Sequence, residues 1–349
     1  MNFSIDGKNI GAGSRPFIIA EMSGNHNQSL ERALAIVDAI ADSGAHALKL
    51  QTYTADTMTI DFAEGEFFID DPKSLWKGNS LYKLYQQAYT PWEWHEPLFK
   101  RAIEHGLIAF STPFDFSAVD FLESLNVPAY KIASFEITDL ALIQKVAATG
   151  KPVIISTGMA TLAEIDEAVG AAYKAGCSNL VLLKCTSSYP ASPVSSNLAS
   201  IPYLRALFKC EVGLSDHTLG IGAAVASIAL GATVIEKHVT LSRAEGGVDA
   251  DFSLEPGELR QLVNETYNAW QALGETKIGP TEEELGSLVF RRTLYVCEDL
   301  NKGDVLNIKN VRAIRPGYGL PPKYLNQFLG KKIIRSVKKG TPINWDIIA

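Results

Sequence analysis

The chain has 349 residues, of which 46% are hydrophobic and 20% are charged, and its formal net charge is −7 at pH 7. This balance is typical of a folded globular protein and excludes a disordered chain. Small residues interrupt the longest apolar stretch, residues 223–232, and it is far shorter than the roughly 20 residues of a membrane span, so a membrane protein is excluded as well. At roughly 150 residues per domain, the length predicts two domains, or one large barrel with a small domain.

Charge is distributed unevenly along the chain. Residues 286–349 hold 12 of the 32 Lys and Arg but only 4 of the 39 Asp and Glu, so this segment carries +8 and the rest of the chain −15. The acidic total argues against nucleic acid as a partner, because phosphate binding needs clustered basic residues. A basic tail favours docking on an acidic main domain or covering an anionic substrate, although chance surface patterning gives the same totals.

The cysteines and the first residues bear on location. Cys177, Cys185, Cys210 and Cys297 show no CxxC spacing. In a chain of this length, that usage predicts reduced thiols in the cytoplasm. The opening MNFSIDGKNIGAG has neither the basic start nor the apolar core of a signal peptide, so we expect no export.

Eight short apolar or β-branched runs recur along the chain, each followed by a segment with helical spacing of its apolar residues. The runs span residues 17–23, 47–53, 108–114, 129–134, 152–158, 179–185, 211–217 and 233–240. Strands buried on both faces form continuous apolar runs, so the pattern predicts a parallel sheet with helices outside. Eight such units match the size of a TIM (β/α)8 barrel. A doubly wound sheet is the alternative, but no GxGxxG follows the first run.

The remaining segments complete the domain plan. Residues 1–280 are expected to form the barrel domain, opening with a small hairpin that plugs the bottom of the barrel. The long connection at residues 54–90 is expected to be a lid or specificity loop, since loops of this length are usually functional. Residues 281–290 are expected to link the barrel to a compact β-rich domain at 291–349.

Polar residues gather near the ends of the predicted strands. They are Glu21, Lys49, Gln51, Ser111, Thr112, Lys131, Ser134, Ser156, Thr157, Lys184, Ser187, Tyr189, Ser215, Asp216, His217, Glu236 and His238. Buried charges are costly unless they are paired or used, and the active site of a TIM barrel lies at this end of the strands. Single buried lysines are most often halves of structural ion pairs, whereas three on different strands favour an anion-binding pocket.

Two histidines end adjacent predicted strands. His217 and His238 are expected about 5 Å apart, and Glu236 shares a face with His238. Two imidazoles beside carboxylates can hold an exchangeable Mn²⁺- or Mg²⁺-like ion. A pair of hydrogen-bonded core histidines is the alternative.

The motifs resemble the sialic-acid synthase family of phosphoenolpyruvate-condensing enzymes along nearly the whole chain. The matching segments are IAEMSGNHNQ (19–28), KLQTY (49–53), STPFD (111–115), YKIAS (130–134), STGMA (156–160), KCTSSYPA (184–191), GLSDHTLG (213–220), EKHVTL (236–241), GGVDADFSLEP (246–256) and RPGYGLPP (315–322). The resemblance implies a TIM barrel followed by a small antifreeze-protein-like (SAF) domain. It also implies a domain-swapped homodimer, in which the SAF domain caps the partner's barrel.

Within that family, the loop segments EGEFFI (64–69) and SLWKG (74–78) look most like those of the pseudaminic acid synthases. Gln28 replaces the Gly that follows I-N-H-N in the N-acetylneuraminate synthases, and Ser187 stands where some of them have Asn. The implied acceptor is therefore 2,4-diacetamido-2,4,6-trideoxy-altropyranose, and an aromatic-rich loop suits so apolar a sugar. N-acetylneuraminate or legionaminate synthesis from another amino sugar is the alternative.

The resemblance also assigns roles to residues. It implies that His217 and His238 hold a divalent ion (Mn²⁺, Mg²⁺ or Co²⁺). Phosphoenolpyruvate would be bound by Lys49, Thr112, Lys131, Ser134, Ser156, Ser187 and Ser215. The sugar would contact Glu21, Gln51, Tyr189 and Asp249, and Arg315 of the partner. The pattern at the strand ends points to most of these residues independently, but not to Asp249 or Arg315.

The implied reaction joins C3 of phosphoenolpyruvate to the sugar aldehyde, adds water at C2 and releases phosphate. A carboxylate must activate that water, and Glu21, Glu236 and Asp249 are all candidates. A metal-free aldolase with a Schiff base on Lys131 or Lys184 is one rival. A non-catalytic sugar-binding barrel is the other, but it would have lost polar strand ends that this chain retains.

Overall fold

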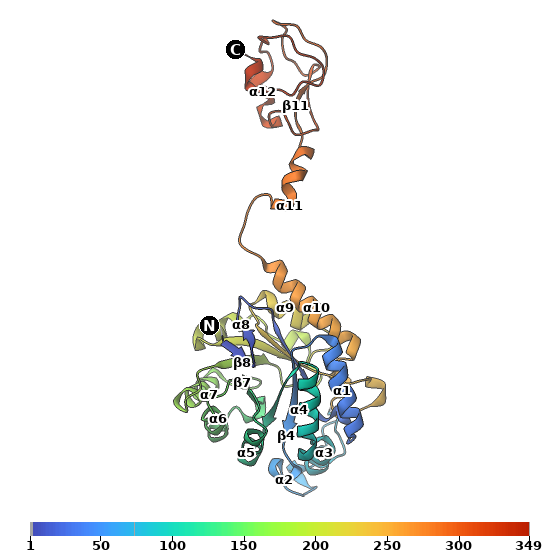
Figure 1. Cartoon of the computed structure of the whole chain (residues 1–349), viewed down its shortest axis with the longest axis vertical. Helices are drawn as coiled ribbons and strands as arrows, with labels where there is room; N and C mark the ends of the chain where they lie inside the picture. The colour runs from blue at the N-terminus through green and yellow to red at the C-terminus, as the bar shows by residue number, and fades with distance from the viewer. Residues whose placement is uncertain (1–2, 73, 349) are drawn as a thin grey trace. The chain divides into compact units, whose positions relative to one another are not determined.

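A computed structural model describes residues 3–72 and 74–348 (Figure 1). The chain divides into two compact units, Met1–Gly274 and Glu275–Ala349. In the described part of the chain, no helix is both long and apolar enough to cross a membrane.

The first unit is a closed barrel of eight parallel strands, in the order β10-β3-β4-β5-β6-β7-β8-β9. The strands are β3 (Phe17–Glu21), β4 (Ala47–Thr52), β5 (Ile108–Pro113), β6 (Tyr130–Ile132), β7 (Val153–Ser156), β8 (Leu180–Cys185), β9 (Glu211–Asp216) and β10 (Val234–His238). All eight predicted runs are therefore strands, and the expected TIM barrel is confirmed. Nearly every strand residue is buried, which explains why the runs show no alternation of polar and apolar residues.

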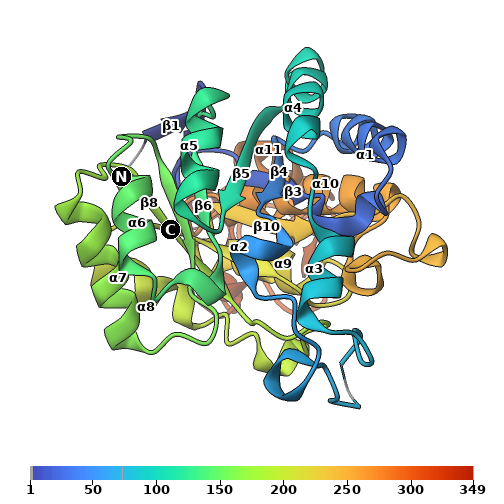
Figure 2. The same cartoon turned by 90° about the horizontal axis from the view of Figure 1, so that it is seen from below.

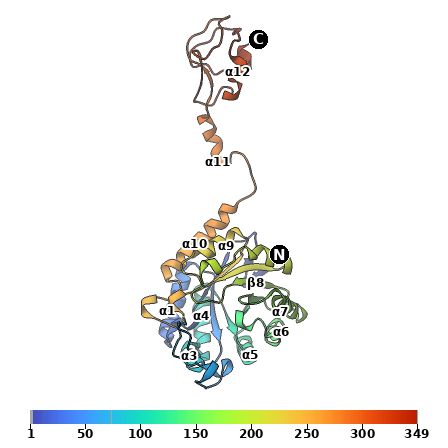
Figure 3. The same cartoon turned by 180° about the vertical axis from the view of Figure 1, so that it is seen from behind.

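Helices surround the strands, as the view from below shows (Figure 2). They are α1 (Leu30–Ser43), α4 (His95–Glu104), α5 (Phe116–Ser124), α6 (Leu140–Ala147), α7 (Leu162–Lys174), α8 (Ser200–Phe208), α9 (Gly222–Ala229) and α10 (Pro256–Leu273). Helix α1 begins where the Ser29 hydroxyl accepts a hydrogen bond from the backbone N–H of Arg32, and it ends at Gly44, whose φ is 81°. Helix α10 packs against α9 and α1 (Figure 3).

A hairpin precedes the barrel, as expected. Strands β1 (Phe3–Ile5) and β2 (Lys8–Ile10) pair antiparallel, and Ile5 and Ile10 are buried in the same apolar core as the barrel strands.

The long connection after β4 is more ordered than a loop. It contains α2 (Ala55–Met58), a 3-10 turn (Gly65–Phe67) and α3 (Leu81–Ala88). Its middle is closed by two backbone hydrogen bonds, from Ile69 N to Asn79 O and from Gly78 N to Ile69 O, each 2.9 Å.

The second unit begins with α11 (Glu282–Leu285) and a 3-10 turn (Gly286–Phe290), which span the expected linker. Strands β11 (Thr293–Val296) and β12 (Val311–Ile314) pair antiparallel, and α12 (Leu325–Phe328) follows. The other pairings are isolated bridges, such as Leu300 with Val337. The small core of the second unit includes Leu294, Phe328 and Ile343.

Candidate active site

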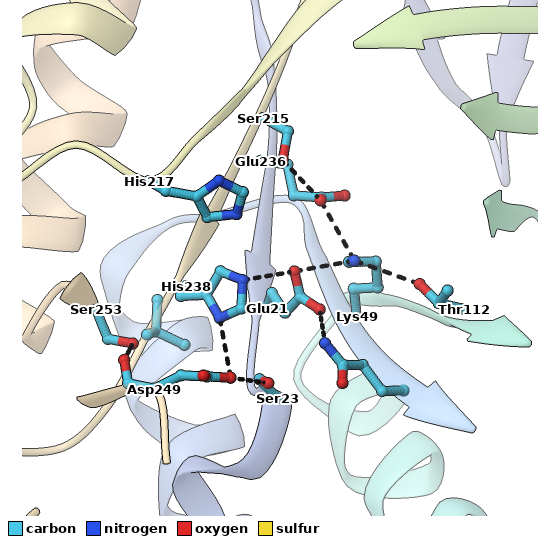
Figure 4. Close-up of polar contacts among 12 residues, drawn as sticks. Glu21, Ser23, Lys49, Thr112, Ser215, His217, Glu236, His238, Asp249 and Ser253 are labelled. Atoms are coloured by element: carbon cyan, nitrogen blue, oxygen red, sulfur yellow. Dashed lines mark hydrogen bonds and ion pairs between the residues drawn. The ribbon is translucent and has the colours of Figure 1, made fainter. Parts of the chain in front are cut away.

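A cavity of about 580 Å³ opens at the carboxyl ends of the barrel strands. All but two of the residues that sequence analysis singled out as catalytic, substrate-binding or metal-ligating line it. The lining residues are Glu21, Lys49, Gln51, Thr112, Lys131, Ser134, Ser156, Tyr189, Ser215, His217, Glu236, His238 and Asp249. Figure 4 shows the polar contacts at its centre.

The register of the strands brings these side chains together. Glu21 is paired in register with Lys49 of β4 on one side and with His238 of β10 on the other. Ser215 of β9 is likewise paired with Glu236. Because side chains alternate along a strand, residues paired in this way face the cavity together.

Two lysines and two glutamates form one buried network. Lys49 Nζ lies 2.9 Å from Glu21 Oε2 and 3.3 Å from Glu236 Oε1. Lys131 Nζ lies 3.3 Å from the same Oε1 atom, to which the Ser215 hydroxyl donates a hydrogen bond of 3.2 Å. Gln51 donates a hydrogen bond of 2.7 Å to Glu21 Oε1. The two positive charges are therefore held in place although their side chains are only 2% exposed.

This network sets the charge states of its members. Burial alone would raise the pKa of Glu21, but the charges of Lys49, His238 and Lys131 together outweigh it and hold that pKa well below its usual value. Burial would lower the pKa of Lys49, yet Glu21 and Glu236 raise it overall. The pKa of Lys131 is lowered, because burial outweighs its attraction to Glu236. Lys49 therefore retains its positive charge more firmly than Lys131 does.

The two histidines lie beside this network. The ring centroids of His217 and His238 are 5.3 Å apart, close to the expected spacing. His238 Nε2 is 3.2 Å from Glu21 Oε2, and His238 Nδ1 is 3.7 Å from Asp249 Oδ2. Asp249 also accepts a hydrogen bond from the Ser23 hydroxyl, and burial raises its pKa.

The two imidazoles can serve as two ligands of a divalent ion. His217 Nδ1 is 3.1 Å from the Thr186 carbonyl oxygen, a contact that leaves Nε2 as the potential ligand atom. His238 Nδ1 is buried and has no hydrogen-bond partner among the residues described. Within residues 3–72 and 74–348, no three His, Cys, Asp or Glu side chains form a ready-made metal site. An ion here would therefore take its other ligands from water and substrate.

Three further buried atoms that line the cavity have no hydrogen-bond partner in the described structure. They are Ser156 Oγ, Glu136 Oε2 and Glu236 Oε2. Folded proteins rarely leave buried polar atoms unpaired. Their gathering in one cavity, together with His238 Nδ1, indicates a site made for a polar ligand.

Ser187 does not line the cavity but lies at its edge. An added Cβ on Gly158 would be 2.2 Å from the Ser187 hydroxyl and 2.7 Å from that of Ser134. Gly158 N donates a hydrogen bond of 3.1 Å to Ser134 Oγ. Ser134, Gly158 and Ser187 therefore form a tight polar corner with room only for glycine at its centre.

Lys184 and Arg315 were also expected to contribute to the site. The expectation that three strand lysines face the pocket is wrong for Lys184, whose Nζ donates a hydrogen bond of 2.7 Å to the Cys185 carbonyl oxygen. Cys185 faces the cavity, so its neighbour Lys184 faces away. Arg315 follows β12 in the second unit, where it is exposed.

The segment 54–90 supplies the apolar wall of the cavity. Met58, Ile69, Trp76, Leu84 and Tyr85 line it. The Trp76 indole N–H donates a hydrogen bond of 2.9 Å to the Val248 carbonyl oxygen, and its ring centroid is 6.0 Å from that of Tyr189.

Sequence reasoning missed several lining residues. Burial raises the pKa of Glu136 to about 7. Cys185 Sγ lies 3.9 Å from His217 Nδ1. Glu136 follows β6 by four residues, so a search limited to strand ends did not reach it. Cys185 was counted only as a buried thiol, although the side-chain alternation along β8 places it on the inner face.

A closed (β/α)8 barrel with a polar cavity at the carboxyl ends of its strands defines a class of barrel enzymes. The model of the NeuB family matches residues 36–278, and that of the SAF domain matches residues 291–349. The chain belongs to the NeuB family, and its tail is a SAF domain.

Named relatives agree with this assignment. The pseudaminic acid synthases of Campylobacter jejuni and Helicobacter pylori are 41% and 42% identical to this chain, each over 95% of it and over 96% and 98% of their own lengths. The crystal structure of N-acetylneuraminic acid (sialic acid) synthetase from Leptospira borgpetersenii, in complex with citrate, is 32% identical. It superposes with a TM-score of 0.73 and covers 82% of this chain and 95% of that one.

Proposed function

We propose that this chain condenses phosphoenolpyruvate with 2,4-diacetamido-2,4,6-trideoxy-β-L-altropyranose and water, and releases pseudaminic acid and phosphate. The main support for this proposal is the group of buried polar atoms without hydrogen-bond partners in the described structure. These atoms line the same cavity as two buried lysines and an apolar wall. The two relatives named pseudaminic acid synthases, each more than 40% identical over 95% of the chain, support this choice of reaction.

The donor would occupy the side of the cavity that holds Lys49 and Lys131. Phosphoenolpyruvate carries about three negative charges, and fixed cations in a dry site stabilise such charge strongly. Lys49 and Lys131 are already held by Glu236, so binding requires little reorganisation. The hydroxyls that would orient the donor are those of Thr112, Ser134, Ser156, Ser187 and Ser215.

In the reaction, C3 of phosphoenolpyruvate bonds to the aldehyde carbon of the open-chain sugar, and water bonds to C2. The C2–O bond to phosphate then breaks, and phosphate leaves. Glu236 Oε2 has no partner among the described residues, so it is free to accept a proton from the water. Glu21 and Asp249 remain the other candidates for this step, and both contact His238.

The proposed cofactor is a divalent ion (Mn²⁺, Mg²⁺ or Co²⁺) on His217 and His238. When bound, such an ion polarises a carbonyl oxygen as a Lewis acid. The histidine side chains are 6% exposed, and the rings of Tyr189 and Phe252 pack against His217. These aromatic neighbours would limit the access of water to the reacting atoms.

The acceptor would lie against the apolar wall. A 6-deoxy sugar with two acetamido groups offers three methyl groups, and Met58, Ile69 and Trp76 offer apolar contacts for them. Gln51, Tyr189 and Asp249 would contact its polar groups. An acceptor of the N-acetylneuraminate or legionaminate pathways is the alternative. N-acetylmannosamine suits the wall less because it carries more hydroxyl groups, and the N,N'-diacetyllegionaminic acid synthase of Campylobacter jejuni is less similar to this chain, at 35% identity.

The proposed assembly is a homodimer in which the partner's SAF domain brings Arg315 to the cavity. Apolar side chains on loops that follow successive strands support a covered rim: Phe135, Met159, Val194 and Leu219 are 59%, 61%, 89% and 63% exposed. The +8 charge of residues 286–349 suits the acidic remainder of the chain. All four cysteines are free thiols, in keeping with the cytoplasmic location that we propose.

The decisive experiment follows phosphate release with phosphoenolpyruvate and each candidate sugar. We expect the highest kcat/KM with the 6-deoxy diacetamido sugar and a value roughly a hundredfold lower with N-acetylmannosamine. A higher kcat/KM with N-acetylmannosamine would refute the acceptor. Borohydride trapping with the keto product tests the Schiff-base rival. Of its two candidate lysines, Lys131 lines the cavity and Lys184 does not.

A further inference from the structure

Two charged residues lie immediately before the two histidines in the chain. Asp216 ends β9 and precedes His217, and Lys237 lies in β10 and precedes His238. Because side chains alternate along a strand, Asp216 and Lys237 face the helix layer while the histidines face the cavity. Lys237 is 0% and Asp216 is 3% exposed, and neither lines the cavity.

These two residues form a closed network with the turn that follows β9. Asp216 and Lys237 are paired in register, and Lys237 Nζ lies 2.7 Å from Asp216 Oδ2. Lys237 Nζ also donates a hydrogen bond of 2.5 Å to the Thr218 carbonyl oxygen. The Thr218 N–H in turn donates one of 2.9 Å to Asp216 Oδ1. The backbone on both sides of His217 is thereby tied to the residue that precedes His238.

Stability alone is a poor explanation for this pair. Removing two charges from water is costly, and apolar residues of similar size often stabilise a buried position equally well or better. A charged pair differs from an apolar contact in fixing both distance and direction, since its hydrogen bonds tolerate little misalignment. The network therefore suits the precise placement of the groups next to it.

We propose that Asp216 and Lys237 are positioning residues, whose ion pair fixes the separation of the His217 and His238 imidazoles and so the affinity of the two-histidine site for a divalent ion. The inference rests on the proposed function, because it takes these histidines as the ligands. Residues that orient metal ligands typically change affinity by about 10- to 100-fold when they are mutated.

The test titrates Mn²⁺ into the metal-free full-length chain and measures free Mn²⁺ by electron paramagnetic resonance. The variants are Lys237→Met, Asp216→Asn and their combination, and thermal unfolding is recorded for each. We expect both single variants to bind Mn²⁺ about 10- to 100-fold more weakly and to unfold at lower temperature. The double variant leaves no buried charge unpaired, so we expect its Tm to recover while its Mn²⁺ affinity stays low.

Glu211→Gln is the matched control. Glu211 opens β9 at the far end of the strand, where it lies 3.1 Å from Arg205 Nη2. We expect a lower Tm and an unchanged Mn²⁺ affinity. If the single variants are too unstable to purify, Lys237→Arg keeps the charge but changes the geometry, and we expect it to lower Mn²⁺ affinity as well.

These measurements distinguish a failure of the positioning role from a failure of the two-histidine metal site. A double variant that recovers both Tm and Mn²⁺ affinity would overturn the positioning role and leave the metal site intact. Wild-type protein that binds no Mn²⁺, or binding that survives His217→Ala, would overturn the metal site and the positioning role with it. Weak Mn²⁺ binding in a stable double variant, with normal binding in Glu211→Gln, supports both.

Discussion

Lys49 and Glu21 form an ion pair of 2.9 Å in which neither side chain is more than 3% exposed. Loss of either partner leaves their buried network with Lys131 and Glu236 carrying one unbalanced charge, which costs about 3–5 kcal/mol. The pair therefore links the fold of the barrel to the charge of the proposed donor site.

We expect Lys49→Met to lower Tm and to abolish phosphate release. The double variant Glu21→Gln/Lys49→Met should regain most of the lost stability but none of the activity, because it lacks both the cation for the donor and Glu21, a candidate base. Thermal unfolding and a phosphate assay give the two readouts. Lys338→Met, which removes an exposed pair with Asp299, is the control and should change neither. Activity in the double variant would contradict the role of Lys49.

Gly158→Ala should raise KM for phosphoenolpyruvate. The new methyl group would meet the hydroxyls of Ser187 and Ser134, so the polar corner must open, at a cost of roughly 1–3 kcal/mol. Gly170→Ala is the matched control: it lies within α7, and no atom lies within 4 Å of the added Cβ in the described structure. We expect Gly170→Ala to stabilise the protein by about 0.5–1 kcal/mol and to leave KM unchanged. Equal KM values in both variants would argue against a donor site at this corner.

Activity should require a divalent ion on His217 and His238. Exhaustive chelation should stop turnover, and adding back Mn²⁺, Mg²⁺ or Co²⁺ should restore it. His217→Ala should remain inactive after the same addition, because one imidazole is a poor site. His105→Ala, at a partly exposed histidine on the outer surface, should respond like the wild type. Full turnover of the chelated wild-type enzyme would contradict the assignment of a divalent ion to His217 and His238.

Two inactive variants should complement each other if Arg315 acts across the dimer. A mixed dimer of Arg315→Ala and His238→Ala has one barrel with both histidines and a partner tail with its arginine. About a quarter of all sites should recover when subunits exchange at random. Native mass spectrometry confirms the exchange, and exchange without recovered activity would exclude the swapped arrangement.

The stability of the barrel should fall as pH drops from about 6.5 to 4. Burial lowers the pKa of His26 and of His95 to about 4, from an ordinary value of 6.5. Between these values the unfolded chain binds more protons than the folded chain, so the free energy of unfolding decreases as the pH falls. The loss is at most roughly 3 kcal/mol for each histidine.

Urea denaturation between pH 7 and pH 4 measures this dependence. Wild type and His26→Gln/His95→Gln are compared, and the variant should show a flatter profile. Parallel profiles for the wild type and the double variant would show that other groups cause the acid sensitivity.

The barrel could be predicted from sequence because its strands are buried on both faces, which makes each one a continuous apolar run. Segment 54–90 was harder, since α2 and α3 are short and are formed amid glycines and acidic residues. Helix α3 buries Leu84 and Ala88. Two apolar residues four positions apart make too short a helical pattern to be recognised among the glycines and acidic residues around them.

The site was predictable where its residues end strands. Glu21, Lys49 and His238 lie on strands, and their neighbours in the sheet are fixed once the barrel is known. Asp249 lies in a loop beyond β10, so only the family resemblance pointed to it. Glu136 and Gly158 were missed because they lie in turns after β6 and β7, where the alternation of side chains along a strand no longer predicts their positions.

The hydrogen bond from Trp76 to Val248 joins segment 54–90, the wall of the proposed acceptor site, to the loop that follows β10. If residues 54–90 alone were exchanged for those of a relative, the new loop would have to pack against the native Val248, the residue before Asp249. A chimera that also carries residues 246–249 would transfer the loop with its own anchoring point. Lys49 and Lys131 lie on strands β4 and β6, outside both segments, so such a chimera would exchange the proposed acceptor wall and leave the proposed donor site unaltered.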